Sequence, residues 1–153
     1  MKHKLYNIRG TRYANLGQLD TAISCYEKAL SIKPNYAEAH YNIGFTFQRL
    51  GQLDAAVRSY KKVVAIKPDY AKSHNNKILS VIYFFTNDQI PDAIDTVEAL
   101  IKDYPKDALL YNICGGCYTS LGRVDMAVKN YEKALAIKPD YAVPRHILNS
   151  LIG

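Results

Sequence analysis

Two cysteines separated by two glycines, Cys114-Gly-Gly-Cys117, form the motif in this sequence that is most suggestive of chemistry. A CxxC pair acts as a redox dithiol, or supplies half of a tetrahedral zinc site that needs two more Cys or His ligands. The sequence has no second CxxC, and its third cysteine, Cys25, is distant along the chain. Since a free cysteine also behaves as a small hydrophobic side chain, we interpret the pair as packing residues and expect no metal and no cofactor.

Two histidines, His40 and His74, stand 34 residues apart at equivalent positions of two similar segments. Equivalent residues of stacked helices lie about 10 Å apart. One ion cannot bridge that distance, because zinc–nitrogen bonds are about 2 Å long. We therefore expect a structural role for both histidines.

No residues suggest catalysis. A nucleophilic Ser or Cys requires a neighbouring base and a third group that orients the base, and no such trio is evident. The glycines do not form a phosphate-binding loop either, because Gly10, Gly17, Gly44, Gly51, Gly115 and Gly122 are all explained by a repeat and Gly116 is the one extra within it. The sequence therefore favours a protein that is not an enzyme.

The elements that carry these residues form a repeat. The segment NLGQLDTAISCYEKALSIKPNYA at 15–37 returns as RLGQLDAAVRSYKKVVAIKPDYA at 49–71 and as SLGRVDMAVKNYEKALAIKPDYA at 120–142. Four prolines follow one another at intervals of 34, 37 and 34 residues, namely Pro34, Pro68, Pro105 and Pro139. A fixed period of this size predicts stacked units that share one core.

Each unit reads as two helices. Apolar residues recur every three to four positions, as at Ile23, Tyr26 and Leu30. Three glycines are expected to end the first helix in the left-handed conformation, three aspartates to cap the second helix, and prolines to stop it. The glycines and aspartates are Gly17, Gly51, Gly122, Asp20, Asp54 and Asp125.

At these residues the sequence resembles the tetratricopeptide repeat family. The residues that carry the resemblance are Tyr6, Gly10, Tyr13, Ala22, Tyr26, Ala29 and Pro34 in the first unit; His40, Ile43, Gly44, Phe47, Ala56, Tyr60 and Pro68 in the second; and Tyr111, Cys114, Gly115, Tyr118, Ala127, Tyr131, Ala134 and Pro139 in the fourth. The resemblance implies an all-α fold, an α-solenoid of four tetratricopeptide helix pairs plus a C-terminal helix, wound as a right-handed superhelix.

This resemblance makes residues 1–153 one domain, with repeats at about 3–36, 37–70, 71–107 and 108–141 and a terminal helix over 142–153. The third repeat departs from the pattern, because Ile78 stands near the glycine position and Val97 replaces the aromatic. Its three additional residues are expected to lengthen its first helix. Pro91 takes the place of the capping aspartate, and Pro144 is expected near the start of the terminal helix.

In this family the first helices line a concave groove that holds a peptide. The groove residues implied by the register are Lys4, Asn7, Thr11, Glu38, Tyr41, Asn42, Phe45, Arg49, Lys72, Asn75, Asn76, Leu79, Tyr83 and Asn112. The asparagines form a ladder of amides suited to the main chain of an extended ligand, and the aromatic rings add apolar contact area. Only Asn42 and Lys72 match the five-residue carboxylate clamp of the members that bind chaperone C-termini.

Charge and hydrophobicity limit the partners. The net charge is +6 and the pI is about 9.1, but Lys and Arg alternate with Asp and Glu. We interpret this as a mild preference for acidic protein ligands and not as a nucleic-acid surface. No apolar run is long enough to cross a membrane, and the N-terminus lacks the apolar core of a secretory signal. The expected location is the cytoplasm.

Three hypotheses for function follow. The first is a non-enzymatic scaffold or adaptor that binds a peptide or protein segment in its groove. The second is the substrate-recognition arm of a larger bacterial glycosyltransferase or sulfotransferase, since the asparagine ladder is similar to those of such enzymes. The third is self-association through terminal helices that no further repeat covers.

Overall fold

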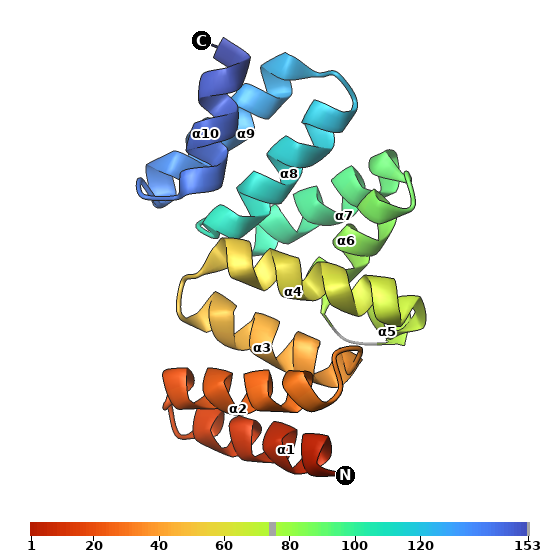
Figure 1. Cartoon of the computed structure of the whole chain (residues 1–153). Coiled ribbons are helices and arrows are strands. Elements are labelled where there is room, and N and C mark those ends of the chain that lie inside the picture. The colour runs from red at the N-terminus through yellow and green to blue at the C-terminus, as the bar shows by residue number, and fades with distance from the viewer. Residues whose placement is uncertain (74–75, 153) are drawn as a thin grey trace. The chain divides into compact units, whose positions relative to one another are not determined.

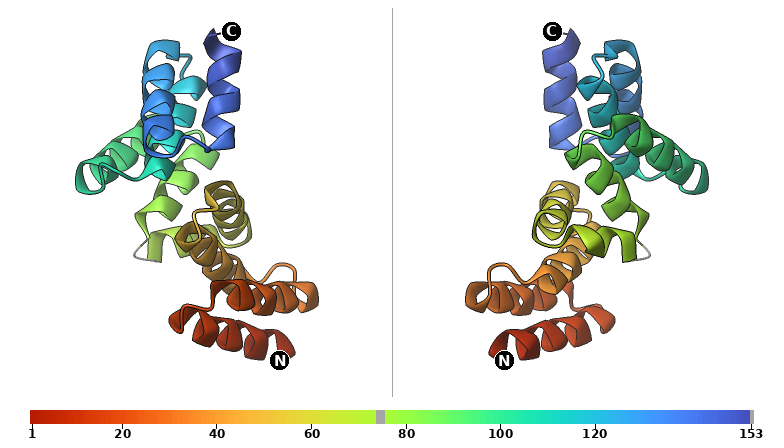
Figure 2. Two further views of the ribbon diagram at one scale, coloured as in Figure 1. Left: turned by 90° about the vertical axis from the view of Figure 1, so that its left-hand side faces the viewer. Right: turned by 90° about the vertical axis from the view of Figure 1, so that its right-hand side faces the viewer.

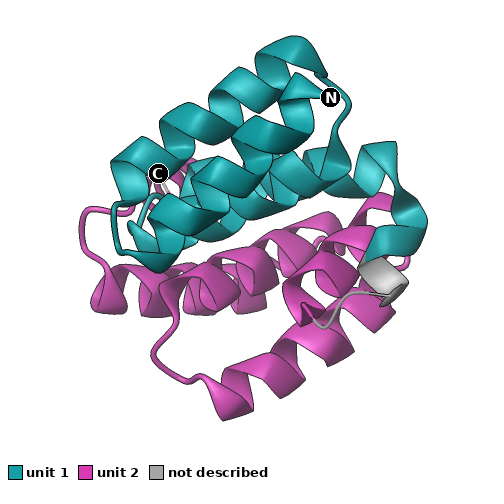
Figure 3. Cartoon of the chain, turned by 90° about the horizontal axis from the view of Figure 1, so that it is seen from below, with its two compact units in different colours: residues 1–74 teal, residues 75–153 magenta. Residues whose placement is uncertain are grey.

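The chain folds into helices only. The computed structural model describes residues 1–73 and 76–152, with side chains omitted for 71–73, and divides the chain into two compact units, residues 1–74 and 75–153 (Figure 3). The prediction of an all-α fold built from helix pairs is confirmed. Within the described ranges, no helix is both long enough and apolar enough to traverse a bilayer.

The first unit holds two helix pairs and a short fifth helix (Figure 1). Its elements are α1 (Lys2–Asn15), α2 (Leu19–Ile32), α3 (Ala37–Arg49), α4 (Leu53–Ile66) and α5 (Pro68–Ser73). Helix α1 packs on α2 and α3 packs on α4, while α2 and α3 join the two pairs. The two further views in Figure 2 show α1 and α2 running side by side.

The second unit repeats this plan. Its elements are α6 (Lys77–Thr86), α7 (Ile90–Asp103), α8 (Ala108–Ser120), α9 (Val124–Ile137) and α10 (Ala142–Ile152). The pairs are α6 with α7 and α8 with α9, and α10 packs on α9. The terminal helix begins two residues before Pro144, which lies in its first turn.

Three of the four pairs cross where a glycine of the first helix lies on a buried tyrosine of the second. These contacts are Gly10 on Tyr26, Gly44 on Tyr60 and Gly115 on Tyr131. A Cβ atom at the three glycines would lie 2.7, 2.9 and 2.6 Å from a ring carbon, closer than real Cβ atoms approach. The absence of a side chain at these glycines therefore lets the two helices of a pair cross closely.

The third pair solves the same packing problem with different residues. Its turn is closed by the bond from Gln89 N to Phe84 O, as the turn after α3 is closed by the bond from Gln52 N to Phe47 O. Three residues before Phe84 stands Val81, which therefore occupies the glycine position and packs in one core cluster with Val97. Two valines of moderate size replace the glycine and the tyrosine.

This alignment corrects the predicted third repeat in two respects. The glycine position is Val81 and not Ile78. The additional residues also do not lengthen the first helix, because α6 has 10 residues where α1 has 14, and the short helix α5 precedes it. Asn76 stops any extension of α6 towards the N-terminus, since its side-chain oxygen accepts the main-chain N–H of Ile78 as an N-cap.

The turns within the pairs confirm one prediction and correct another. Gly17, Gly51 and Gly122 have φ values of 79°, 77° and 73°, which a side chain would strain. The predicted caps Asp20, Asp54 and Asp125 instead lie in the first helical turn, since the N-cap residues are Gln18, Gln52 and Arg123. These carboxylates act on the positive end of the helix dipole rather than as N-caps.

Candidate functional site

The first helices of the first unit carry eight of the residues predicted to line a groove. The exposed or half-buried side chains are Lys4, Thr11, Glu38, Tyr41, Asn42, Phe45 and Arg49, and Asn7 is buried. Helix periodicity places Tyr41 and Phe45 on one face of α3, because residues four apart are neighbours on a helix surface. The Phe45 side chain is 49% exposed, so an aromatic ring stands open on this face.

Asn7 and Asn42 bind each other. The Asn42 Nδ2 donates to Asn7 Oδ1 over 3.0 Å, and this bond joins α1 to α3. Thr11 Oγ1 donates to the main-chain oxygen of Asn7 at 3.1 Å and lies 3.1 Å from the Tyr26 hydroxyl. Part of the predicted amide ladder therefore holds two repeats together, and Asn7 is closed to a ligand.

Tyrosine rings surround the base of this surface. The Tyr41 ring centroid lies 6.0 Å from that of Tyr60 and 5.7 Å from that of Tyr70. Burial, and then the Glu38 carboxylate, raise the pKa of Tyr70 to about 12. The Tyr36 hydroxyl donates to Glu38 Oε2 at 3.4 Å. Glu38 therefore lies beside phenols that stay neutral at physiological pH.

Tyr70 is absent from the predicted site, although its position could have been recognised from the sequence. It is the tyrosine of the recurring KPDYA phrase, and its counterpart in the preceding repeat, Tyr36, is buried. In the sequence, this phrase indicates only the end of a helix. In the structure its tyrosine supports the ring of Tyr41 in the groove.

Arg49 joins the end of the same surface to α1. Its Nη1 donates to the main-chain oxygen of Ala14 over 3.1 Å, in the last turn of α1. A cation at that place also interacts favourably with the negative end of the α1 dipole. Arg49 remains partly exposed and is a fixed positive charge at the edge of the surface.

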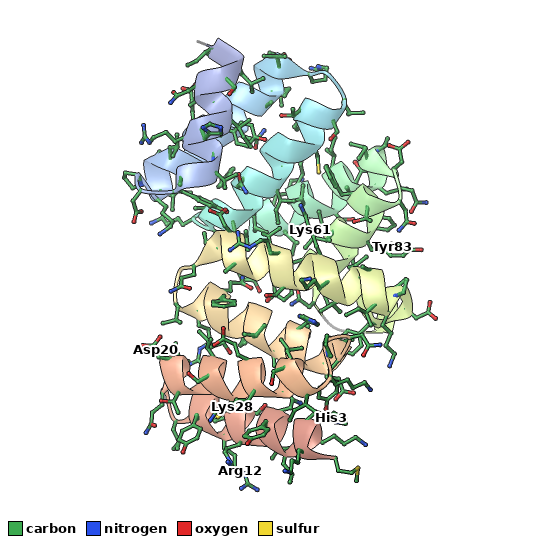
Figure 4. The ribbon with its side chains drawn as sticks, in the orientation of Figure 1. His3, Arg12, Asp20, Lys28, Lys61 and Tyr83 are labelled. Carbon is green, nitrogen blue, oxygen red and sulfur yellow. The ribbon has the colours of Figure 1, made fainter. Side chains whose placement is uncertain are left out.

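In the second unit the predicted groove residues are dispersed. Leu79 is fully buried, so its assignment to an open groove is corrected: in the observed register it has the repeat position of Asn42 and not that of Phe45. Asn76 is the N-cap of α6. Tyr83, labelled in Figure 4, is half-buried, and its ring packs edge-on against Phe84 at 5.9 Å.

Three other predicted residues complete the account. Asn112 is half-buried, and its Oδ1 is a buried acceptor with no hydrogen-bond partner among the described residues. The side chains of Lys72 and Asn75 lie outside the described residues. The predicted groove residues of the second unit thus differ in burial and in role, so the first unit is the better-defined part of the candidate surface.

The CxxC cysteines are core residues. Cys114 and Cys117 are free thiols with no exposed surface, and both belong to the core cluster that contains Tyr131. Burial is the main cause that raises the pKa of Cys114 to about 12 and that of Cys117 to about 11. Among the described residues, no three His, Cys, Asp or Glu side chains lie close enough to hold a metal ion.

His40 has a structural bond. Its Nε2 lies 2.8 Å from the main-chain oxygen of Pro34, as the Tyr111 hydroxyl lies 2.9 Å from that of Pro105. Residues at this repeat position therefore hold the loop that enters their helix. Burial lowers the pKa of His40 and keeps the ring neutral near pH 7. The other histidine of the predicted pair, His74, lies outside the described residues.

A pocket on the second unit was not predicted from the sequence. It has a volume of about 520 Å³ and lies among α7, α8 and α9. Its walls carry both signs of charge, including Glu98, Lys102 and Lys133. The Lys133 Nζ lies 5.7 Å from the Tyr111 ring centroid, a cation–π contact that occupies one wall.

Comparison with known proteins gives consistent family matches. A TPR repeat family matches residues 10–51, and two tetratricopeptide repeat families match residues 37–70 and 80–142. Together they span most of the described chain. The match to residues 37–70 covers the pair of α3 and α4, whereas the other two matches begin within α1 and within α6.

Curated relatives match over part of the chain. The peroxisomal targeting signal receptor of Candida glabrata is 31% identical over 67 residues, which are 44% of this chain and 11% of that protein. The Hsp70-Hsp90 organizing protein 2 of Arabidopsis thaliana is 34% identical over 58 residues, which are 38% of this chain and 10% of that protein. The matched segment thus corresponds to about a tenth of the length of these relatives.

Solved structures match over nearly the whole chain. The crystal structure of MamA protein is 27% identical with a TM-score of 0.50, and the match covers 98% of this chain and 80% of that one. A thermophilic TPR protein of Thermus thermophilus is 24% identical with a TM-score of 0.50, and the match covers 97% of this chain and 80% of that one. The second similarity concerns the fold alone.

Proposed function

This chain belongs to the tetratricopeptide repeat family, and on that premise we propose that it is a non-enzymatic scaffold that binds a peptide or protein segment. The binding surface is the face of α1 and α3 that carries Lys4, Thr11, Tyr41 and Phe45. The chain supplies no evident catalytic group in this surface, so its contribution is recognition.

The exposed ring of Phe45 is the observation that carries the proposal. Single exposed apolar side chains are common, but this one stands four residues after Tyr41, whose ring is braced by Tyr60 and Tyr70. A rigid aromatic base with one open ring is typical of binding hot spots, because little side-chain entropy is lost on binding.

Charge supports an acidic ligand. The surface has cations at its two ends, Lys4 on α1 and Arg49 on α3, and a single carboxylate, Glu38. Arg49 is held in place by its bond to Ala14, so its remaining donors are preorganised for a carboxylate. The curated relatives are named as a receptor for a targeting signal and as an organizer of other proteins, in agreement with a polypeptide ligand.

Peptides selected from a random library on the purified chain test the proposal. With each selected peptide, Phe45→Ala should weaken binding by about tenfold or more, which is about 1.4 kcal/mol, in a fluorescence anisotropy titration. The matched control is Leu121→Ala, because Leu121 is 47% exposed and lies in the turn after α8. Phe45 is preferred to Asn42 as the test residue, since loss of Asn42 also removes its bond to Asn7.

The opposite result is clear. If Phe45→Ala and Leu121→Ala bind the selected peptides equally well, the ligand does not use the α1–α3 face, and the proposed surface is wrong.

A further inference from the structure

The outward side of α1 is a second unusual surface. In the first unit α3 rests on the α1–α2 pair, and this contact covers Ala39 and Thr46, which are 0% and 1% exposed. The equivalent residues of α1, 34 positions earlier in the sequence, are Leu5 and Arg12, and both are exposed. The face that α3 buries against the preceding helix pair is therefore exposed in α1.

We name this face the outer stripe, and it consists of Leu5, Ile8, Arg12 and Leu16. The spacing of three, four and four residues places these side chains on one side of the helix and its C-cap. Leu5 is 60% exposed, Ile8 is 49% exposed and Leu16 is 71% exposed. Figure 4 shows Arg12 pointing away from α2. Three large apolar side chains in line are more than the scattered exposure of an ordinary surface.

The charge around the outer stripe has one sign. Helix α1 carries Lys2, Lys4, Arg9 and Arg12, and residues 1–16 contain no Asp or Glu. At 100° per residue, Lys2, Arg9 and Arg12 fall within about 60° of Leu5 around the helix axis. A partner that covers the outer stripe must therefore place anions beside it.

The terminal helices of a second copy of this chain do not meet that requirement. Two α1 helices side by side would bring their cations together without a compensating acid. The terminal helix α10 offers exposed Arg145 and His146, and residues 142–152 contain no Asp or Glu. Charge complementarity therefore disfavours both terminal helices of another copy as the occupant.

In the second unit the corresponding face of a first helix is covered by another helix of the chain. There the helix α8 has Leu110 and Cys117 at the positions of Leu5 and Arg12, and both are buried in one cluster with Val97 and Leu100 of α7. Helix α7 is amphipathic and acidic on its more exposed side, where Asp92, Asp95 and Glu98 are found. A first-helix face of this chain is thus covered by an acidic amphipathic helix.

We propose that the outer stripe of α1 docks an acidic amphipathic helix of a partner protein. The apolar ridge of the partner packs on Leu5, Ile8 and Leu16, and its carboxylates pair with Arg12 and the neighbouring cations. A helix fits better than a lipid surface, because the wide apolar face of α1 is used against α2 and the remaining ridge is as narrow as one helix contact.

The test uses the full chain and two synthetic helical peptides of about 20 residues, a length that favours helix formation. Both peptides carry one leucine stripe; the first has glutamates on its flanks and the second has lysines. In anisotropy titrations the acidic peptide should bind, with affinity falling as salt rises, and the basic peptide should bind at least about tenfold more weakly.

Variants separate this surface from the groove. The double variant Leu5→Asn and Ile8→Asn, and separately Arg12→Glu, should each weaken binding of the acidic peptide by about tenfold or more. The control Leu121→Asn should leave binding unchanged, and so should Phe45→Ala, which tests the proposed groove. Circular dichroism verifies that the variants fold, as expected for exposed positions.

Four results would overturn the proposal. One is failure of the acidic peptide to bind at millimolar concentration, and a second is equal binding of that peptide by the wild type and the stripe variants. Another is Leu5-dependent sedimentation of the chain with phosphatidylserine vesicles in the absence of peptide binding, which would assign the stripe to a membrane. The last is a Leu5-dependent rise of mass with concentration in light scattering, which would assign it to a second copy.

Discussion

Replacement of Gly115 or Gly116, two adjacent glycines of α8, by alanine should change the free energy of unfolding in opposite directions. A Cβ atom on Gly115 would lie 2.6 Å from Tyr131 Cε1 and 2.8 Å from its Cδ1 and Cζ. A Cβ atom on Gly116 would meet only the Tyr131 hydroxyl, at 3.9 Å. Both glycines lie in the interior of one helix, so the backbone contribution is common to the two variants and the packing contribution differs.

The magnitudes follow from these contacts. Replacing a helix-interior glycine by alanine stabilises a protein by about 1 kcal/mol when the methyl group has room, as at Gly116. At Gly115 the methyl group must displace the ring of Tyr131, which is 1% exposed and cannot move into solvent. Overpacking of this kind costs about 1–3 kcal/mol. With the backbone gain subtracted, the net result is a loss of up to about 2 kcal/mol for Gly115→Ala and a gain of about 1 kcal/mol for Gly116→Ala.

Urea denaturation followed by circular dichroism measures both changes. With unchanged m-values, the midpoint should fall for Gly115→Ala and rise for Gly116→Ala. The third helix pair suggests a rescue, since Val81 and Val97 replace the glycine and tyrosine there. In a Tyr131→Val background, Gly115→Ala should therefore cost less than in the wild type. Equal shifts of the same sign for the two glycines would refute the close-crossing account.

Three further predictions concern single groups. Burial raises the pKa of the thiols of Cys114 and Cys117 from 9.0 to about 12 and about 11. Both thiols should therefore react with iodoacetamide at pH 8 only after the protein unfolds. The free energy of unfolding should decline above about pH 9, because the unfolded chain releases these protons more readily than the folded chain. Burial is the main cause that lowers the pKa of His40 from 6.5, so an NMR titration of this histidine should give a pKa below that value. The urea midpoint should fall as the pH drops below 6.5, because the unfolded chain binds the proton before the folded chain does. Replacing the N-cap Asn76 by Ala should reduce the free energy of unfolding by about 1 kcal/mol, Asn76→Asp should retain it, and Asp107→Ala at the N-cap of α8 should give a loss of the same size.

The sequence was sufficient for the helix pairs because each pair depends on local chemistry. Gly17 adopts a left-handed conformation that ends the first helix of its pair. Pro34 follows the second helix, because a proline does not fit the interior of a helix. The glycine and tyrosine positions also carry shape, since Gly10 leaves the space that the Tyr26 ring fills. These signals lie within one repeat and require no knowledge of the neighbouring ones.

The third repeat was predicted less well because a period reports the size of an insertion and not its place. The interval of 37 residues between Pro68 and Pro105 indicates three additional residues. The structure places them before α6, where Asn76 forms a new N-cap, and this shifts every groove position of that helix by three. The sequence consequently assigns Leu79 to the open face, although it is fully buried.

The candidate site was only partly predictable for a different reason. The position of Asn7 in the repeat determines the direction of its Cβ atom. It does not determine whether the amide, which lies at the edge of a contact between helices, faces a ligand or pairs with another amide. The choice depends on Asn42, 35 residues away, whose Nδ2 reaches Asn7 Oδ1 at 3.0 Å. Once that pair forms, the carbonyl of Asn7 is satisfied, and the exposed ring of Phe45 becomes the residue on which the proposed binding surface depends. The same reasoning distinguishes the two faces of α1. One face is closed, because its polar groups form hydrogen bonds with α3. On the other face, Leu5 and Arg12 are exposed and no helix among the described residues covers them, so this is the face on which we propose that a partner binds.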